Sequence, residues 1–134
     1  MISRLRPALA LVACLTLTAC QNAIDLSITG GPERPVIAIA SGMHLSTSKP
    51  CVTDIRVLRG SEMRDVVWSV KSADRKCPRL RSASYGETPP GFEVLKPAQP
   101  LKAGEVYEVV VTGYGWIGSQ RVVWRDGRYQ PLGA

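Results

Sequence analysis

Histidine is almost absent from this chain, and cysteine is scarce. There is one histidine, His44, and two of the four cysteines, Cys14 and Cys20, lie near the start of the chain. The other pair, Cys51 and Cys77, has no CxxC spacing and too few neighbouring ligands for a zinc site. Serines near His44 lack the orienting third group and the nucleophile-elbow motif of a hydrolase. The sequence therefore predicts no metal, and we expect His44 to be an ordinary surface residue.

Other absences narrow the class of protein. The chain has no phosphate-binding loop, dinucleotide fingerprint or internal repeat. We therefore expect no cofactor and a non-enzymatic domain. No segment has helical periodicity, and no apolar run reaches the roughly 20 residues of a membrane-spanning helix. Ten prolines and twelve glycines among 134 residues instead predict many turns between short strands.

The first 20 residues, MISRLRPALALVACLTLTAC, are organised like an export signal. Arg4 and Arg6 form a positively charged start, and residues 7–19 are an uncharged apolar stretch of signal-peptide length. The segment from Leu17 to Cys20 resembles the bacterial lipobox, in which small residues precede a cysteine. This resemblance implies cleavage before Cys20, a diacylglyceryl group on its thiol and, usually, an acyl chain on the new amine.

Two other interpretations of the leader stay open. The segment from Leu11 to Cys14 also fits a lipobox, although cleavage there leaves an apolar region at the lower limit of length. The second interpretation is an ordinary signal peptide, cut so that Cys20 stays free. With Cys20 as the lipid site, the chain divides into a signal peptide, a lipidated N-terminus with a short tether, and one β-domain: residues 1–19, 20–23 and 24–134.

Lipid on Cys20 implies that the protein is located in the cell envelope and is bound to a membrane through this lipid. Gln21 occupies the position where Asp often marks inner-membrane retention. The resemblance therefore implies an outer-membrane protein facing the periplasm, if the organism has two membranes. The formal net charge of +6, to which Arg4 and Arg6 of the leader contribute, favours anionic surfaces, although a solvated surface that keeps the protein soluble is the simpler explanation.

Cys51 and Cys77 are the cysteines of the expected mature domain outside the lipid site. An exported protein meets an oxidising compartment, where an even pair of cysteines is typical of a disulfide. We therefore expect Cys51 and Cys77 to be bonded to each other.

Alternation of apolar and polar residues predicts eight or nine short strands and an all-β fold. In the segment after Cys51, for example, Ile55 and Val57 share one face. Asp126-Gly127 predicts a type I′ turn in a C-terminal hairpin, because both residues tolerate positive φ. The expected strands are 24–29, 36–40, 51–58, 66–70, 79–85, 92–95, 101–111, 120–124 and 128–130.

The segment Leu101–Val111 resembles the tyrosine-corner strand of fibronectin type III and other immunoglobulin-like domains. It has their Leu-x-x-Gly-x-x-Tyr-x-Val-x-Val pattern. The resemblance implies that Tyr107 bonds its hydroxyl to nearby backbone and that Val109 and Val111 point into the core. It also implies a small antiparallel β-sandwich, with Trp68 as the candidate core tryptophan. A small β-barrel is the alternative.

Aromatic and basic residues come together towards the end of the chain. Thr112–Gly118 combines three glycines with Tyr114 and Trp116, and is either a binding loop or a hairpin tip packed on its neighbours. With Arg121 and Arg125 these aromatics form a possible binding loop. Sugar or cell-wall ligands fit it better than nucleic acid, which an exported protein rarely meets. Core aromatics and edge-protecting arginines are the simpler explanation.

Three functions are compatible with these features. The first is a non-enzymatic envelope domain that binds another protein or a wall component, or stabilises an assembly at the membrane. The second is an inhibitor or immunity protein that blocks an incoming hydrolase. An enzyme ranks last, because the sequence carries no catalytic motif.

Overall fold

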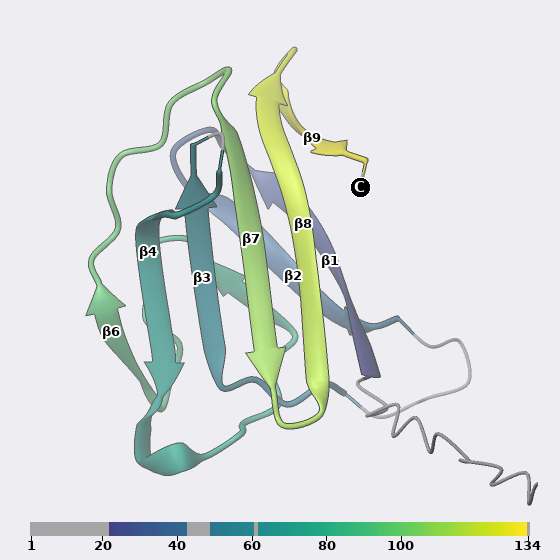
Figure 1. Ribbon diagram of the computed structural model, residues 1–134, viewed down its shortest axis with the longest axis vertical. Helices are drawn as coiled ribbons and strands as arrows, with labels where there is room; N and C mark the ends of the chain where they lie inside the picture. Colours follow the sequence, from purple (N-terminus) through teal and green to yellow (C-terminus); the bar gives the residue numbers. More distant parts are fainter. Residues whose placement is uncertain (1–21, 43–48, 61, 134) are drawn as a thin grey trace, which may run out of the picture.

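The computed structural model describes residues 22–42, 49–60 and 62–133 (Figure 1). Strands dominate, which confirms the all-β prediction, and one 3-10 turn, η1 (Ala73–Arg75), follows the fourth strand. In this part of the chain no helix is long and apolar enough to cross a membrane. Cys14, Cys20, Gln21 and His44 lie outside the described residues. The strands are β1 (Asn22–Gly30), β2 (Pro35–Ser41), β3 (Asp54–Arg59), β4 (Asp65–Ser72), β5 (Ser82–Ser84), β6 (Phe92–Lys96), β7 (Val106–Gly113), β8 (Trp116–Arg125) and β9 (Arg128–Leu132).

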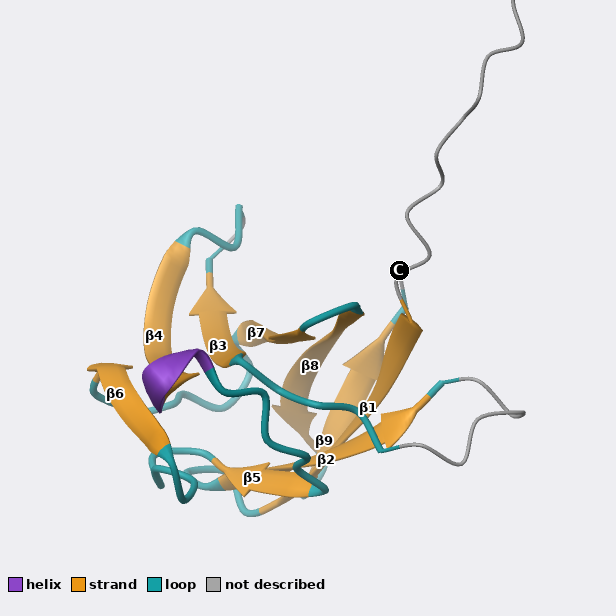
Figure 2. Ribbon diagram, turned by 90° about the horizontal axis from the view of Figure 1, so that it is seen from below, coloured by secondary structure: helices purple, strands orange, loops and turns teal. Residues whose placement is uncertain are grey.

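The strands form one sheet that curls around the core, as the view from below in Figure 2 shows. Their order is β5-β2-β1-β8-β7-β3-β4-β6, and β9 pairs with β8. The described ladders are antiparallel except between β1 and β8, where Asn22 and Ala23 pair in parallel with Trp116 and Ile117. This contact joins two groups of strands into one mixed sheet. It also starts β1 two residues earlier than the alternation predicts.

Side chains alternate between the core and the outer face, as predicted for β7. Tyr107, Val109 and Val111 are buried, whereas the residues between them are partly covered. Trp68 of β4 is 1 % exposed. Its ring meets the Tyr85 ring edge-on, with the centroids 5.2 Å apart. The core therefore contains the corner tyrosine and the tryptophan that the sequence suggested.

Three buried tyrosines fasten loops to the sheet through their hydroxyl groups. The Tyr107 hydroxyl accepts an N–H from the turn before β7 at 2.8 Å, which confirms the predicted bond between this hydroxyl and nearby backbone. The hydroxyls of Tyr85 and Tyr129 donate to the carbonyl oxygens of Gln99 and Pro32, each at 2.6 Å. Burial raises the pKa of Tyr85 and of Tyr129 to about 12, because a buried phenolate would lose its hydration. Both hydroxyls therefore remain donors at physiological pH.

The C-terminal hairpin turns where the sequence predicted. Asp126 and Gly127 have φ angles of 53° and 76°, and a type I′ turn requires positive φ at both positions. Arg125 pairs with Arg128 on either side of the turn. The turn therefore fixes the register of β9 against β8.

Candidate functional site

The β7–β8 hairpin ends in a tight turn. Gly113 pairs with Trp116, so Tyr114 and Gly115 alone form the turn. The Tyr114 side chain is 61 % exposed, whereas Trp116 is partly buried and packs against the core. Of the two interpretations of Thr112–Gly118, the structure therefore has the packed hairpin tip.

Glycines on this hairpin let neighbouring backbone come close. A Cβ on Gly113 would lie 1.8 Å from the carbonyl oxygen of Cys51, and a Cβ on Gly118 would lie 2.3 Å from that of Ile24. No side chain fits such spaces, because atoms at these distances overlap. The two glycines therefore fit the hairpin tightly against the Cys51 segment and against β1.

Gly113→Ala is expected to destabilise the domain by about 1–3 kcal/mol, as is typical of an overpacked site. The added methyl group would meet backbone, which cannot rotate aside as a flexible side chain can. Gly31→Ala is the matched control, since a Cβ at Gly31 has no atom within 4 Å. Urea melts of the two variants measure the difference, and equal midpoints would contradict the close approach at Gly113.

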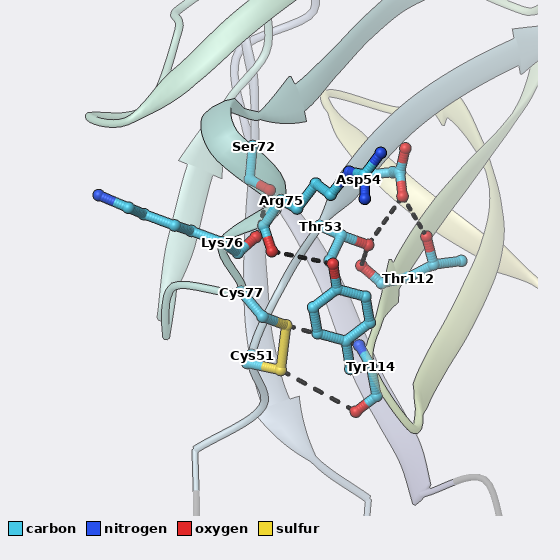
Figure 3. Close-up of a disulfide and its surroundings, with 9 residues drawn as sticks. All are labelled: Cys51, Thr53, Asp54, Ser72, Arg75, Lys76, Cys77, Thr112 and Tyr114. Atoms are coloured by element: carbon cyan, nitrogen blue, oxygen red, sulfur yellow. Dashed lines mark hydrogen bonds between the residues drawn. A yellow bond between two sulfur atoms is a disulfide. The ribbon is translucent and has the colours of Figure 1, made fainter.

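The disulfide between Cys51 and Cys77 lies beside this turn (Figure 3). Their Cα atoms are 5.0 Å apart, within the usual range, in agreement with the predicted pairing. The Tyr114 N–H donates to Cys77 Sγ at 3.5 Å, and the Tyr114 hydroxyl donates to the Arg75 carbonyl oxygen at 2.9 Å. These bonds hold the Tyr114 ring between the disulfide and η1 while one side of it remains in solvent.

A shallow polar hollow of about 340 Å³ opens beside Tyr114. Asp54, at the start of β3, has its carboxylate oriented by two hydroxyl groups. Its Oδ2 accepts hydrogen bonds from Thr53 at 2.8 Å and from Thr112 at 3.0 Å (Figure 3). The lining therefore carries hydroxyl groups and charges of both signs: Thr53, Asp54, Lys71, Ser72, Asp74, Arg75, Glu93 and Tyr114.

The groups that line this hollow are polar or charged, and they can contact a ligand. Of the three carboxylates that line it, Asp74 and Glu93 are exposed, and Asp54 is half-buried and accepts hydrogen bonds from two hydroxyl groups. Among residues 22–42, 49–60 and 62–133 no group of three or more His, Cys, Asp or Glu could hold a metal ion. Charges of both signs beside an exposed aromatic ring can instead contact a polar ligand or a lipid headgroup.

The structure does not bring together the four residues of the possible binding loop. Tyr114 and Trp116 lie at the disulfide end, and Arg125 lies at the opposite end of β8 (Figure 1). Strand geometry puts roughly 30 Å between the two ends of β8. Arg121 lies between them, opposite Glu108 of β7, and lines two hollows of about 640 and 530 Å³. The four residues therefore belong to separate surfaces.

The cluster of Thr53, Asp54 and Thr112 was not predicted. Asp54 and Thr112 are cross-strand partners of β3 and β7, so their contact depends on the register of two strands far apart in sequence. The alternation after Cys51 indicated only that Asp54 lies on the face opposite Ile55. No local spacing marks the partner threonine.

Comparison of the chain with protein-family models, with curated proteins and with solved structures finds no match. A function is therefore proposed from the sequence of the leader and from the side chains on the described surfaces.

Proposed function

We propose that this chain is a lipoprotein of the bacterial cell envelope, anchored through Cys20, whose β-domain is a non-enzymatic binding or structural module. The observation that carries the proposal is the lipobox-like leader followed at once by folded structure, since β1 begins at Asn22. The disulfide of the domain fits an oxidising compartment. Two or more acyl chains would give stable attachment, because one chain holds a protein only marginally. Gln21 after the cysteine favours the outer membrane in an organism with two membranes.

The domain, in this proposal, has an immunoglobulin-like arrangement. In that fold one sheet contains strands A, B and E and the other contains C, F and G. The neighbours β5-β2-β1 and β8-β7-β3 follow the same scheme, with β7 in the place of strand F, which carries the tyrosine corner. The hydrogen bond to the Tyr107 hydroxyl supports the same assignment. The added strands β4 and β6 would then extend the second sheet at its edge.

The partner, in this proposal, is an envelope protein or a wall component that meets the face around Arg121. Arg121 is exposed and borders both of the larger hollows. A guanidinium group binds carboxylates in a bidentate manner, which suits acidic side chains and the peptide stems of a cell wall. The apolar Leu132 lines the same two hollows and adds contact area.

Cys20→Ala is expected to abolish membrane attachment, because it removes the site of the lipid. Fractionation of cells that express the full chain should move the protein from membranes to the soluble fraction, or show unprocessed precursor. Cys14→Ala is the matched control and should fractionate like the wild type. Mass spectrometry of the mature wild type should find acyl groups on Cys20, and acyl groups on Cys14 would contradict the proposal.

A further inference from the structure

We propose that the disulfide-bonded end of the domain rests on the bilayer that holds the anchor, with Tyr114 and Trp116 among the lipid headgroups. This inference rests on the proposed lipid on Cys20. Its starting point is a backbone contact: the Asn22 N–H donates to the Gly115 carbonyl oxygen at 2.7 Å. The beginning of β1 is thereby fixed beside the turn of the β7–β8 hairpin, and Figure 1 shows the two at the same end of the molecule.

Chain length then limits how far the lipid can be from this turn. Gln21 alone separates Asn22 from Cys20. An extended chain advances at most about 3.6 Å per residue, so the Cα of Cys20 lies within about 7 Å of the Cα of Asn22 in any conformation. Acyl chains on Cys20 can therefore enter a bilayer only if this end of the domain is close to it.

The surface at this end suits an interface between water and lipid. We call Ala23, Tyr114, Trp116 and Ile117 the apolar tip; Trp116 is its partly buried member and lies on the face of β8 opposite Ile117. Tyr114 and Ile117 are 61 % and 43 % exposed, and Ala23, the parallel partner of Ile117, is exposed too. Tyrosine and tryptophan are enriched at membrane surfaces because each ring joins an apolar body to a polar edge. The apolar tip therefore fits the headgroup region next to the anchor.

Charges around the apolar tip are mixed. Arg75 and Lys76 are exposed near Tyr114, where they can contact lipid phosphates. Asp74 and Glu93 are exposed beside them and oppose binding to an anionic surface. The aromatic rings, more than the charges, are therefore expected to orient the domain. In this orientation the face around Arg121 and the far end at Arg125 point away from the bilayer and are open to a partner.

Two tryptophans at opposite ends of β8 make the orientation measurable. Trp116 begins the strand and Trp124 is near its end, roughly 26 Å apart by strand geometry. The acylated full chain, purified in detergent, is placed in phosphatidylcholine–phosphatidylglycerol vesicles with and without lipids brominated near the headgroup. Bromine quenches tryptophan emission only at short range. We expect quenching in the wild type and in Trp124→Phe, and loss of most of it in Trp116→Phe.

A second variant controls for a folding defect in Trp116→Phe. Adding Tyr114→Trp to Trp116→Phe puts an indole at the exposed position of the turn and should restore quenching. If Cys20 is acylated but bromine still quenches the emission of Trp116→Phe, the proposed orientation is wrong. Loss of quenching in Trp124→Phe would overturn it in the same way, and neither result would affect the proposed anchor. A mass spectrum with unmodified Cys20 would overturn the proposed anchor, and the orientation with it.

Discussion

Replacing Tyr107 with alanine is expected to lower the free energy of unfolding by about 3–5 kcal/mol, the usual loss for a large aromatic side chain in a core. The Tyr107 residue is 2 % exposed, so its removal leaves a cavity between packed strands. The Lys102 N–H, which donates to the Tyr107 hydroxyl at 2.8 Å, loses its partner as well. Small domains have only about 5–15 kcal/mol of stability, so urea melts should show a large shift of the midpoint.

Two comparison variants separate the contributions of the ring and the hydroxyl. Tyr107→Phe keeps the ring and should cost about 0.5–1.5 kcal/mol, because the Lys102 N–H loses its acceptor and the Glu105 carboxylate loses a donor. Tyr114→Ala removes an exposed tyrosine of the same hairpin and should stay within about 0.5 kcal/mol of the wild type. If Tyr107→Ala unfolds at the same urea concentration as Tyr114→Ala, the tyrosine corner does not stabilise this domain.

Replacing both Cys51 and Cys77 with alanine is expected to cost about 2–5 kcal/mol. The disulfide closes a loop that contains β3 and β4, and therefore Trp68 and much of the core. In the unfolded chain this bond restricts the conformations available, and its removal returns that entropy to the unfolded state. The same change should loosen Tyr114, whose N–H donates to Cys77 Sγ.

Unfolding the wild type with and without reductant provides the control for this variant. The reduced wild type should unfold at the same urea concentration as the double alanine variant, since both lack the covalent bond. Alkylation of denatured, non-reduced protein gives an independent measurement. Labelling of both thiols under those conditions would show that the bond does not form.

Local patterns in the sequence predicted that strands form and where the C-terminal turn lies, but not all strand boundaries. The structure starts β3 three residues and β7 five residues later than predicted, and starts β8 four residues earlier. Asp126-Gly127 forms its turn because two adjacent positions need positive φ, and few residue pairs allow this. The hydroxyl of Tyr107 bonds to the backbone of Lys102, and the spacing of Leu101, Gly104 and Tyr107 had indicated such a bond. Such features depend on a few neighbouring residues, so a single sequence contains the information.

Contacts between distant strands could not be predicted in the same way. The parallel pair of β1 and β8 leaves no periodicity in either strand, although it joins the sheet and places Asn22 beside the apolar tip. From the sequence alone, the glycines of Thr112–Gly118 fitted either a binding loop or a hairpin tip packed on its neighbours. Their true partners, the backbones of Cys51 and Ile24, come from elsewhere in the chain. For the same reason one interpretation grouped Tyr114 with Arg125, which the structure places at opposite ends of β8.

The junction of β1 and β8 also determines when the fold can be completed during synthesis. Asn22 leaves the ribosome early, but its partner Trp116 belongs to the second-last strand to emerge. Until then β1 has an open edge, because β2 is the one of its two neighbours that has already emerged. Pairing between such distant segments is slow, and an open edge can pair with other chains. We therefore expect nascent chains that stop before β8 to aggregate, and chaperones to matter most before β8 covers the edge of β1.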